Sequence, residues 1–421
     1  MYVSSSRSTP APGTAGVARP GPGRARAAVA PNVVALGSVS LITDISSEMI
    51  TAVLPMYVIF TLGLSPLQFG ALNGMYFGIT ALVRLAGGHA ADRWQRRKLV
   101  AGSGYALSAL CKLGLFAAGA SVPALGAVIA ADRTGKGLRT GPRDALISLS
   151  STPGTLGRSF GIHRALDTTG AFLGPLVAFA LLMADPDRYD TVFVASFCIA
   201  AFAVVVLALT VRDRREALVG PQGVTVRAAL RLLLLPRFRR VCIGAALLGT
   251  VALSDSFVYL LLQERLDIAV EYFPLLPLGT TATYLLLAVP FGQLADRLGR
   301  LRVFTGGYVA LLGAYLLLFG PVGGAALLIT TLVLHGLFYA ATDGVLMAAV
   351  GPLLPVELRA SGMALIQTGQ SVAMLASSVL FGAAWTLWGL HAALALALAA
   401  LVTAVLAALW ILPLREEGSR T

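Results

Sequence analysis

Apolar residues in this 421-residue chain gather into long runs, and short segments that carry most of the charge separate these runs. A helix needs about 20 apolar residues to cross the hydrocarbon core of a bilayer. The pattern therefore predicts an all-α membrane protein with twelve transmembrane helices. Their approximate limits are 33–60, 66–90, 99–119, 122–143, 158–183, 190–211, 240–262, 271–294, 302–320, 323–349, 358–385 and 389–413.

The composition agrees with this class and excludes a soluble domain. Hydrophobic residues make up 57% of the chain and charged residues 12%, whereas about a quarter of the residues of a soluble domain are charged. The net charge is +12, but the basic residues lie mainly in the short loops, as membrane topology requires. We therefore expect the lipid bilayer as a partner and no nucleic acid.

The basic loops also predict the orientation and the domain limits. They follow every second predicted span, so the positive-inside rule places both termini in the cytoplasm and the chain in the cytoplasmic membrane. Residues 1–30 are predicted to be a disordered basic tail, without the apolar core of a signal peptide. The other divisions are a six-helix bundle at 31–211, a cytoplasmic linker at 212–239, a second bundle at 240–413 and a tail at 414–421.

The two halves of the chain repeat one another. The sequence GHAADRWQRRKLV at 88–100 matches GQLADRLGRLRVF at 292–304, which places Asp92 over Asp296. Such a repeat implies two bundles of like topology, related by a pseudo-twofold axis, with a binding site between them near the middle of the membrane.

The repeated loops resemble the signature of the major facilitator superfamily, which lies between helices 2 and 3 and, more weakly, between helices 8 and 9. The resemblance implies alternating access to a central site and an aspartate in each loop that closes the inner gate by contacting the opposite bundle. Arg359 is the expected partner of Asp92, and Arg158 that of Asp296. The first loop departs from the signature at Gln95, where the family usually has Gly. The matching residues are Gly88, Asp92, Arg93, Arg96 and Arg97 in the first loop, and Gly292, Asp296, Arg297, Gly299 and Arg300 in the second.

The fifth predicted span contains DTTGAFLGPLVA at 167–178. Gly170, Gly174 and Pro175 resemble the G-x-x-x-G-P element of drug/proton antiporters in this superfamily, and that resemblance implies export. The trailing glycine pair of the element is absent. Ordinary helix packing is the alternative interpretation, because small residues four apart are common where membrane helices meet.

The fourth predicted span is unusual because six of the seventeen residues in ADRTGKGLRTGPRDALI, at 131–147, are ionisable. At 100° per residue, Asp132, Lys136, Arg139 and Arg143 fall within about 60° of one another. A charged stripe that faced lipid would be strongly unfavourable, so it is expected to face a watery cavity. Arg133 resembles the helix-4 arginine that is linked to proton transfer in the family.

Counter-charges lie on neighbouring spans. Asp44 and Glu48 are four residues apart on the first span, with Asp44 expected at the depth of Arg133, and Asp167 lies on the fifth. Asp44, Glu48 and Asp167 are the candidate proton carriers; a static salt-bridge lattice that orders the bundle is the alternative. The full proton-coupling set is Asp44, Glu48, Asp132, Arg133, Lys136, Arg139 and Asp167.

The carboxy-terminal half is poorer in charge, and it is expected to give the substrate a milder, mostly apolar wall. Asp255, the counterpart of Asp44, is the only ionisable residue deep in its seventh span. The predicted cavity residues of this half are Asp255, Tyr284, His335, Tyr339, Gln367 and Gln370.

Together these features predict a proton-coupled transporter that works by alternating access and exports a small organic molecule. An anionic metabolite (a carboxylate, a phosphate ester or a metal chelate) held by the cationic face of span 4 is the alternative. A sensor or an enzyme on the same fold is a remote alternative. The four histidines are scattered, and no nucleophile or metal spacing occurs. We expect a monomer with no metal and no cofactor, driven by the proton gradient.

Overall fold

The computed structural model describes residues 29–94, 96–152, 155–185, 188–213, 230–355 and 358–413; for 81–82, 84–94 and 360 it describes the backbone alone. Helices make up nearly all of these ranges, which contain no β-strand. Most of the predicted tails and linker, at 1–28, 214–229 and 414–421, lies outside them.

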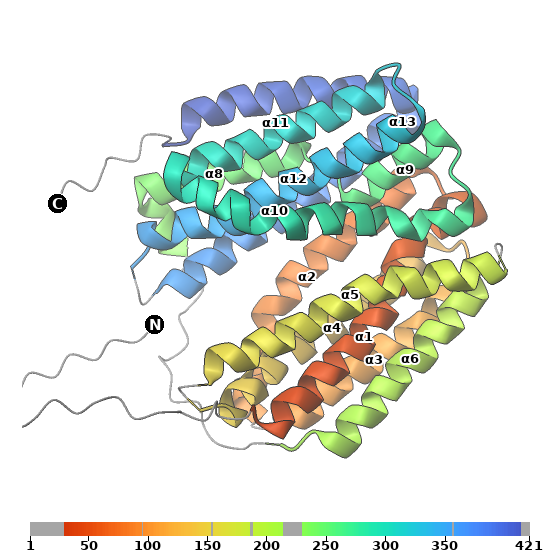
Figure 1. Ribbon diagram of the computed structural model, residues 1–421, viewed down its shortest axis with the longest axis vertical. Coiled ribbons are helices and arrows are strands. Elements are labelled where there is room, and N and C mark those ends of the chain that lie inside the picture. The colour runs from red at the N-terminus through yellow and green to blue at the C-terminus, as the bar shows by residue number, and fades with distance from the viewer. Residues whose placement is uncertain are drawn as a thin grey trace, which may run out of the picture.

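Six long helices form the amino-terminal half (Figure 1). Within it α1 packs against α5 and α6, and α4 packs against α2 and α3. The elements are α1 (Pro31–Met56) with a π-helical turn η1 (Tyr57–Thr61), α2 (Pro66–Trp94), α3 (Arg97–Ala117), α4 (Val122–Ser150), α5 (Leu156–Ala184) and α6 (Tyr189–Thr210).

The carboxy-terminal half repeats this arrangement. It differs from the predicted spans in two places. The seventh span, predicted as one helix, is broken between α8 and α9 at residues 252–254, and the last two spans lie on α13. Gly389 divides α13 with φ 79°, a left-handed angle that favours glycine. The elements are η2 (Leu232–Leu234), α8 (Pro236–Val251), α9 (Asp255–Leu266), η3 (Val270–Leu275), α10 (Leu276–Leu298), α11 (Arg300–Phe319), α12 (Gly324–Val350), η4 (Gly351–Leu353) and α13 (Arg359–Ile411).

The helices confirm the predicted fold class. Nine helical stretches in the described ranges are long and apolar enough to cross a membrane. Neither α2 nor α4 is among them, and α4 carries the charges described above. With these two helices, and with α13 taken as two, the arrangement is consistent with the twelve predicted spans.

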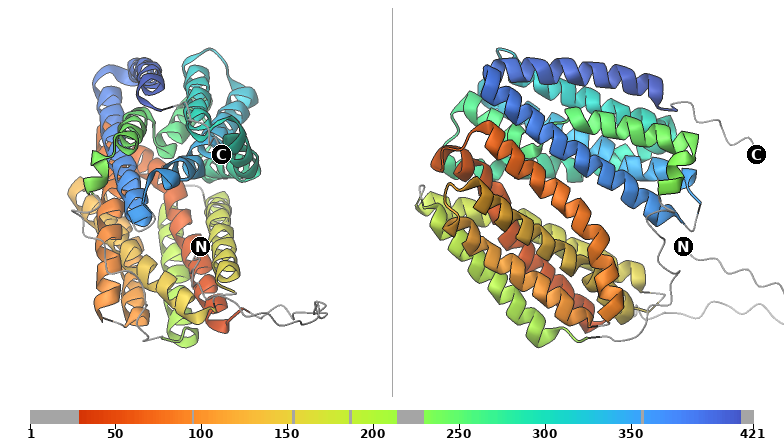
Figure 2. Two further views of the ribbon diagram at one scale, coloured as in Figure 1. Left: turned by 90° about the vertical axis from the view of Figure 1, so that its left-hand side faces the viewer. Right: turned by 180° about the vertical axis from the view of Figure 1, so that it is seen from behind.

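The two halves meet at the end of the molecule opposite the termini, here called the far end (Figure 2). The main contact joins α2 to α13, and η3 packs against α1 and α5. Asn73 of α2 donates hydrogen bonds to Ser254 (2.6 Å) and Ser378 (3.2 Å) of the other half. Phe69 packs edge-on against Phe257 at 5.1 Å. Toward the termini the two groups of ribbons diverge (Figure 1). The structure is therefore closed at its far end.

Candidate functional site

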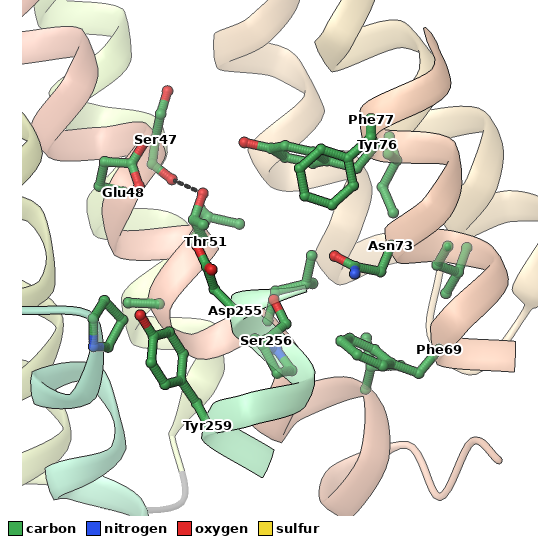
Figure 3. Close-up of a pocket in the computed structure, with 18 of the residues that line it drawn as sticks. Ser47, Glu48, Thr51, Phe69, Asn73, Tyr76, Phe77, Asp255, Ser256 and Tyr259 are labelled. Carbon is green, nitrogen blue, oxygen red and sulfur yellow. Dashed lines mark hydrogen bonds between the residues drawn. The ribbon is translucent and has the colours of Figure 1, made fainter. Parts of the chain in front are cut away.

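A cavity of about 520 Å³ lies between the two halves (Figure 3). This volume falls within the range of small-molecule sites, roughly 300–1,000 Å³. The cavity is lined by α1, α2, α3 and α4 on one side and by α9, η3, α10 and α12 on the other. The sequence predicted a site in this position. Of the predicted site residues, those that line the cavity are Glu48, Asp132, Arg133, Asp255, Tyr284 and Tyr339.

Asp132 is the centre of a buried ionic cluster on the amino-terminal wall. Its carboxylate accepts hydrogen bonds from Ser108 (2.6 Å), from the Lys112 ammonium (3.0 Å) and from Arg133 Nε (3.0 Å). Asp132, Lys112 and Arg133 are each at most 6% exposed. The guanidinium of Arg133 also lies over the ring of Tyr76, 3.9 Å from its centroid. Every charge in this cluster has a close partner.

Two glycines bring α3 and α4 close enough for this cluster to form. A Cβ at Gly104 would lie 2.6 Å from the carbonyl oxygen of Gly135, and a Cβ at Gly135 would lie 2.7 Å from that of Gly104. Small residues let membrane helices approach at backbone distance. Ser108 and Lys112 follow Gly104 at intervals of four on the same face of α3, so they reach Asp132.

The carboxy-terminal wall carries two carboxylates, and no lysine or arginine of this half is among the lining residues that the structure describes. Asp255 opens α9 directly after the break in the seventh span, and its Oδ1 contacts Tyr339 Oη (2.5 Å) and His335 Nε2 (2.9 Å). Asp343 accepts a hydrogen bond from Tyr284 at 3.3 Å. The sequence predicted Asp255 as a cavity residue, and the break in the seventh span brings it to the cavity as the first residue of α9.

The other predicted residues of this half lie away from the cavity surface. His335 is fully buried behind Asp255. Gln367 and Gln370 are partly buried on α13, and neither is among the described residues that line the cavity.

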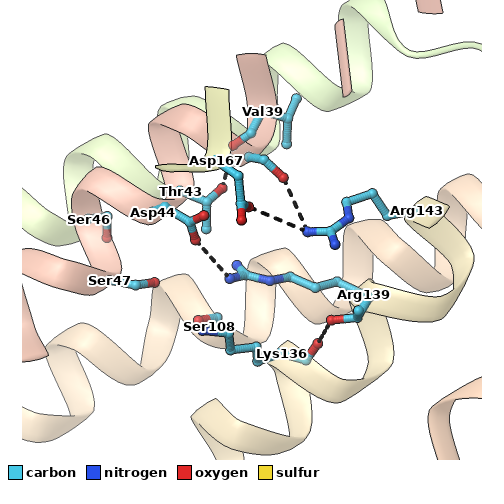
Figure 4. A network of polar contacts seen from close by, with 12 residues as sticks. Val39, Thr43, Asp44, Ser46, Ser47, Ser108, Lys136, Arg139, Arg143 and Asp167 are labelled. Carbon is cyan, nitrogen blue, oxygen red and sulfur yellow. Dashed lines mark hydrogen bonds and ion pairs between the residues drawn. The ribbon is translucent and has the colours of Figure 1, made fainter. Parts of the chain in front are cut away.

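A second ionic network lies on α1, α4 and α5, nearer to the termini (Figure 4). Asp44 Oδ1 is 3.7 Å from Arg139 Nη2, and Asp167 Oδ1 is 3.9 Å from Arg143 Nη1. The carboxylates of Asp44 and Asp167 lie side by side. Arg143 also pairs with Asp144 at 3.0 Å.

This network corrects two expectations about α4. Asp44 faces Arg139 and not Arg133, which is six residues or about 9 Å away along the helix. The predicted stripe also does not face one cavity, because Asp132 and Arg133 line the cavity whereas Arg139 and Arg143 belong to the network. Lys136 lies between them without an ion pair among the described residues. Helix α4 packs against α1, α2, α3 and α5, so successive turns face different partners.

The glycines of the span-5 motif lie against α1. A Cβ at Gly174 would come within 2.7 Å of Glu48 Cβ and of the carbonyl oxygen of Ile45. Gly170 faces the backbone of Leu41 in the same way, one turn earlier. The motif therefore sets the close approach of α5 to α1 and the position of Glu48, which agrees with the packing interpretation.

In the second signature loop Asp296 pairs with Arg300 of the same loop at 2.9 Å, and Arg300 donates to the carbonyl oxygen of Ala348. Gly299 has φ 99°, which explains why this turn needs glycine. The contact predicted between Asp296 and Arg158 requires the two halves to meet near the termini, and it stays a prediction.

In the first loop, Arg97 is buried and Arg96 is exposed. For Gly88, Asp92 and Arg93 the structure describes the backbone alone. The contact between Asp92 and Arg359 therefore also stays a prediction.

Several site residues were not predicted from the sequence. Ser108 and Lys112 complete the Asp132 cluster, and Lys112 could have been suspected as the one lysine within an apolar run. Apart from Tyr284 and Tyr339, the aromatic and hydroxyl groups of the cavity were not predicted, because such residues are common in membrane helices. Those that line the cavity include Tyr76, Ser256, Tyr259 and Thr280.

Residues 36–283 and 256–421 match the Major Facilitator Superfamily. The chain belongs to this superfamily. It is 32% identical over 362 residues to the uncharacterized MFS-type transporter MJ1317 of Methanocaldococcus jannaschii, covering 84% of this chain and 88% of that protein. An uncharacterized protein of Mycobacterium tuberculosis is 32% identical over 157 residues, which are 37% of this chain and 38% of that protein.

Solved structures of major facilitator transporters have the same fold. The nucleoside transporter NupG superposes with a TM-score of 0.78 at 16% identity, over 90% of this chain and 98% of that chain. A bacterial homologue of the human lysosomal transporter Spinster, in an inward-facing and unoccupied conformation, gives 0.68 at 17% identity, over 90% and 94%. This major facilitator protein is thus a multi-pass membrane transporter of small molecules and not an enzyme.

Proposed function

We propose that this transporter couples the movement of protons to the export of a small organic solute through the central cavity. The observation that carries the proposal is the pair of carboxylates, Asp44 and Asp167, held between α1 and α5 beside the arginines of α4. The solute and the proton then occupy separate sites, because neither aspartate lines the cavity.

The geometry of the pair suits reversible protonation. Its distances to Arg139 and Arg143 are 3.7 and 3.9 Å, longer than the roughly 2.7–2.9 Å of a charge-assisted hydrogen bond. Two adjacent carboxylates repel each other when both are ionised, so such a pair tends to keep one proton. Asp132, with three partners at 3.0 Å or less, is by contrast fixed in its ionised form and serves as a structural group.

The pair is also placed where a conformational change would act on it. Asp44 and Asp167 lie on two helices that pack tightly together, whereas Arg139 and Arg143 lie on α4; Arg164, which also pairs with Asp167 at 3.7 Å, moves with α5. A movement of α1 and α5 relative to α4 changes the distance between carboxylate and guanidinium, and with it the affinity for the proton. With the termini in the cytoplasm, this structure opens toward the cell interior, and proton entry would drive solute exit. We expect a monomer to suffice, since both halves of the cavity come from one chain.

An anionic solute has little support from the arrangement of charges. The cations that line the cavity, Lys112 and Arg133, both bind Asp132, and Arg139 faces Asp44. Of the cations on this face of α4, Arg139 and Arg143 pair with acids of their own half, and Lys136, which has no ion pair among the described residues, does not line the cavity.

Proteoliposomes with pyranine inside would test the proposal. An acidic interior is imposed, and a panel of amines, carboxylates, nucleosides and dipeptides is added outside, one at a time. Exchange of solute for protons raises the internal pH, and Asp44→Asn and Asp167→Asn should abolish this response. Asp190→Asn is the matched control, because Asp190 pairs with Arg188 at the far end, away from both sites. Solute entry at an undiminished rate after nigericin has collapsed the gradient would overturn proton coupling.

A further inference from the structure

We infer that the transported solute is an organic cation, bound with its charge against the α9, α10 and α12 wall of the cavity. This inference rests on the proposed function, because it names the class of solute that the cavity accepts. It follows from where the charges of the cavity lining are compensated and where they are not.

On the amino-terminal wall the charges cancel. Glu48 and Asp132 stand against Lys112 and Arg133, so two acids face two cations. Both cations contact Asp132, and Arg133 is also covered by the ring of Tyr76. A solute therefore meets no free positive charge on this wall.

On the carboxy-terminal wall the charges do not cancel. Asp255 and Asp343 line the cavity, and no lysine or arginine of this half is among the described lining residues. His335 touches Asp255 from behind, and it is neutral unless protonated. The described lining residues thus include four acids and two cations, and the excess of two acids lies on one side. A low-dielectric cavity with such an excess attracts a cation and repels an anion.

The acceptors of this wall are only partly satisfied. The Asp255 side chain is 46% exposed, and both of its side-chain hydrogen bonds go to one oxygen, Oδ1. Asp343 has a single long contact, 3.3 Å from Tyr284. Asp255 and Asp343 thus keep carboxylate oxygens available on the cavity surface for a ligand that brings positive charge or donors.

Aromatic rings complete the wall. Tyr259, Tyr284 and Tyr339 all line the cavity beside the two acids. The faces of such rings attract cations within about 6 Å. Arg133 over Tyr76 shows the same interaction on the opposite wall, where the cation belongs to the protein. An apolar solute body with one positive charge would match both the rings and the acids.

Two probes of equal shape and opposite charge test the inference. Tetraphenylphosphonium and tetraphenylborate differ in the sign of one charge, and both are smaller than the 520 Å³ cavity. Equilibrium dialysis with the purified full-length chain should show saturable binding of the phosphonium, at least tenfold tighter than any binding of the borate. Asp255→Asn and Asp343→Asn should each weaken phosphonium binding about tenfold or more, whereas Glu264→Gln, an exposed position on α9, should not.

Tighter binding of the borate, or unchanged phosphonium affinity in both aspartate variants, would overturn the inference. Thermal unfolding of each ligand-free variant shows that the fold is intact, and Asp343 is suited to this because its side chain is exposed. The two proposals fail separately. Proton exchange driven only by neutral or anionic solutes would leave proton coupling standing and exclude a cation. Phosphonium binding without any solute–proton exchange would support a cationic solute and exclude proton coupling.

Discussion

The ammonium of Lys112 on α3 lies 3.0 Å from the carboxylate of Asp132 on α4, and both side chains are less than a tenth exposed. Removing one partner of a buried ion pair leaves an uncompensated charge in a low-dielectric interior, which destabilises a fold by about 3–5 kcal/mol. Arg133 still contacts Asp132, so the lower end applies. Lys112→Met should lower the free energy of unfolding by about 3 kcal/mol, measured by denaturant unfolding in mixed micelles.

Lys136→Met is the control for this prediction. Lys136 lies one turn beyond Asp132 on α4 and has no ion pair in the described part of the chain. Its replacement should therefore change the free energy of unfolding by less than about 1 kcal/mol. Equal stability of the two variants would contradict the structural role assigned to the Lys112–Asp132 pair.

Gly135→Ala should separate α3 from α4. The added Cβ would lie 2.7 Å from the carbonyl oxygen of Gly104 and 3.2 Å from Ser108 N, so the helices must move apart. Overpacking of this kind destabilises by about 1–3 kcal/mol. Gly161→Ala on α5 is the matched control, since nothing lies within 4 Å of its Cβ position, and alanine there should stabilise by about 0.5–1 kcal/mol. A neutral effect of Gly135→Ala in the same unfolding assay would contradict the close approach.

The fold could be predicted from the sequence because its signals are local. Long apolar runs fix membrane helices, and a repeated loop fixes the symmetry of the halves. Gly389 lies at the boundary predicted between the last two spans. The break at 252–254 could not be predicted in this way, because it falls within a predicted span and depends on how the chain packs against neighbouring helices.

The sequence predicted which charged residues belong to the site better than it predicted which acid pairs with which cation. The carboxylates and cations of α1, α4 and α5 stood out because charge within an apolar run is rare. Which acid meets which cation depends on the relative shift of neighbouring helices. An error of a turn or two moved Asp44 from Arg133 to Arg139. On the carboxy-terminal wall the sequence predicted Asp255 as a cavity residue but not Asp343 beside it, because that placement depends on how α9, α10 and α12 pack.

Asn73→Ala should weaken the closure of the far end. Its side chain donates two hydrogen bonds to the other half, to Ser254 and Ser378. Each contributes about 0.5–1.5 kcal/mol net, so their loss should favour the opened far end by about 1–3 kcal/mol, or roughly 5–150-fold in population.

Spin labels can be attached at Ser121→Cys and Val322→Cys after the three native cysteines are replaced. Pulsed electron double resonance would then report the opening as a longer distance between the two labels. Ser371→Ala is the control, because that hydroxyl bonds only to the preceding turn of its own helix, at Gln367 O. An unchanged distance distribution in Asn73→Ala would show that other contacts hold the far end closed.

Asp44→Asn, Asp167→Asn and the double variant should have the same effect on proton binding. The two carboxylates lie side by side, and we propose that they hold one proton between them. Removing either acid leaves the other alone beside its arginine, which keeps it ionised, so the shared proton is already lost. Infrared difference spectra between acidic and alkaline samples report protonated carboxyl groups through their C=O stretching band. Each single variant should lose one equal component, the double variant should lose no more, and Asp190→Asn should lose none. Two different components that add in the double variant would mean that the acids titrate independently.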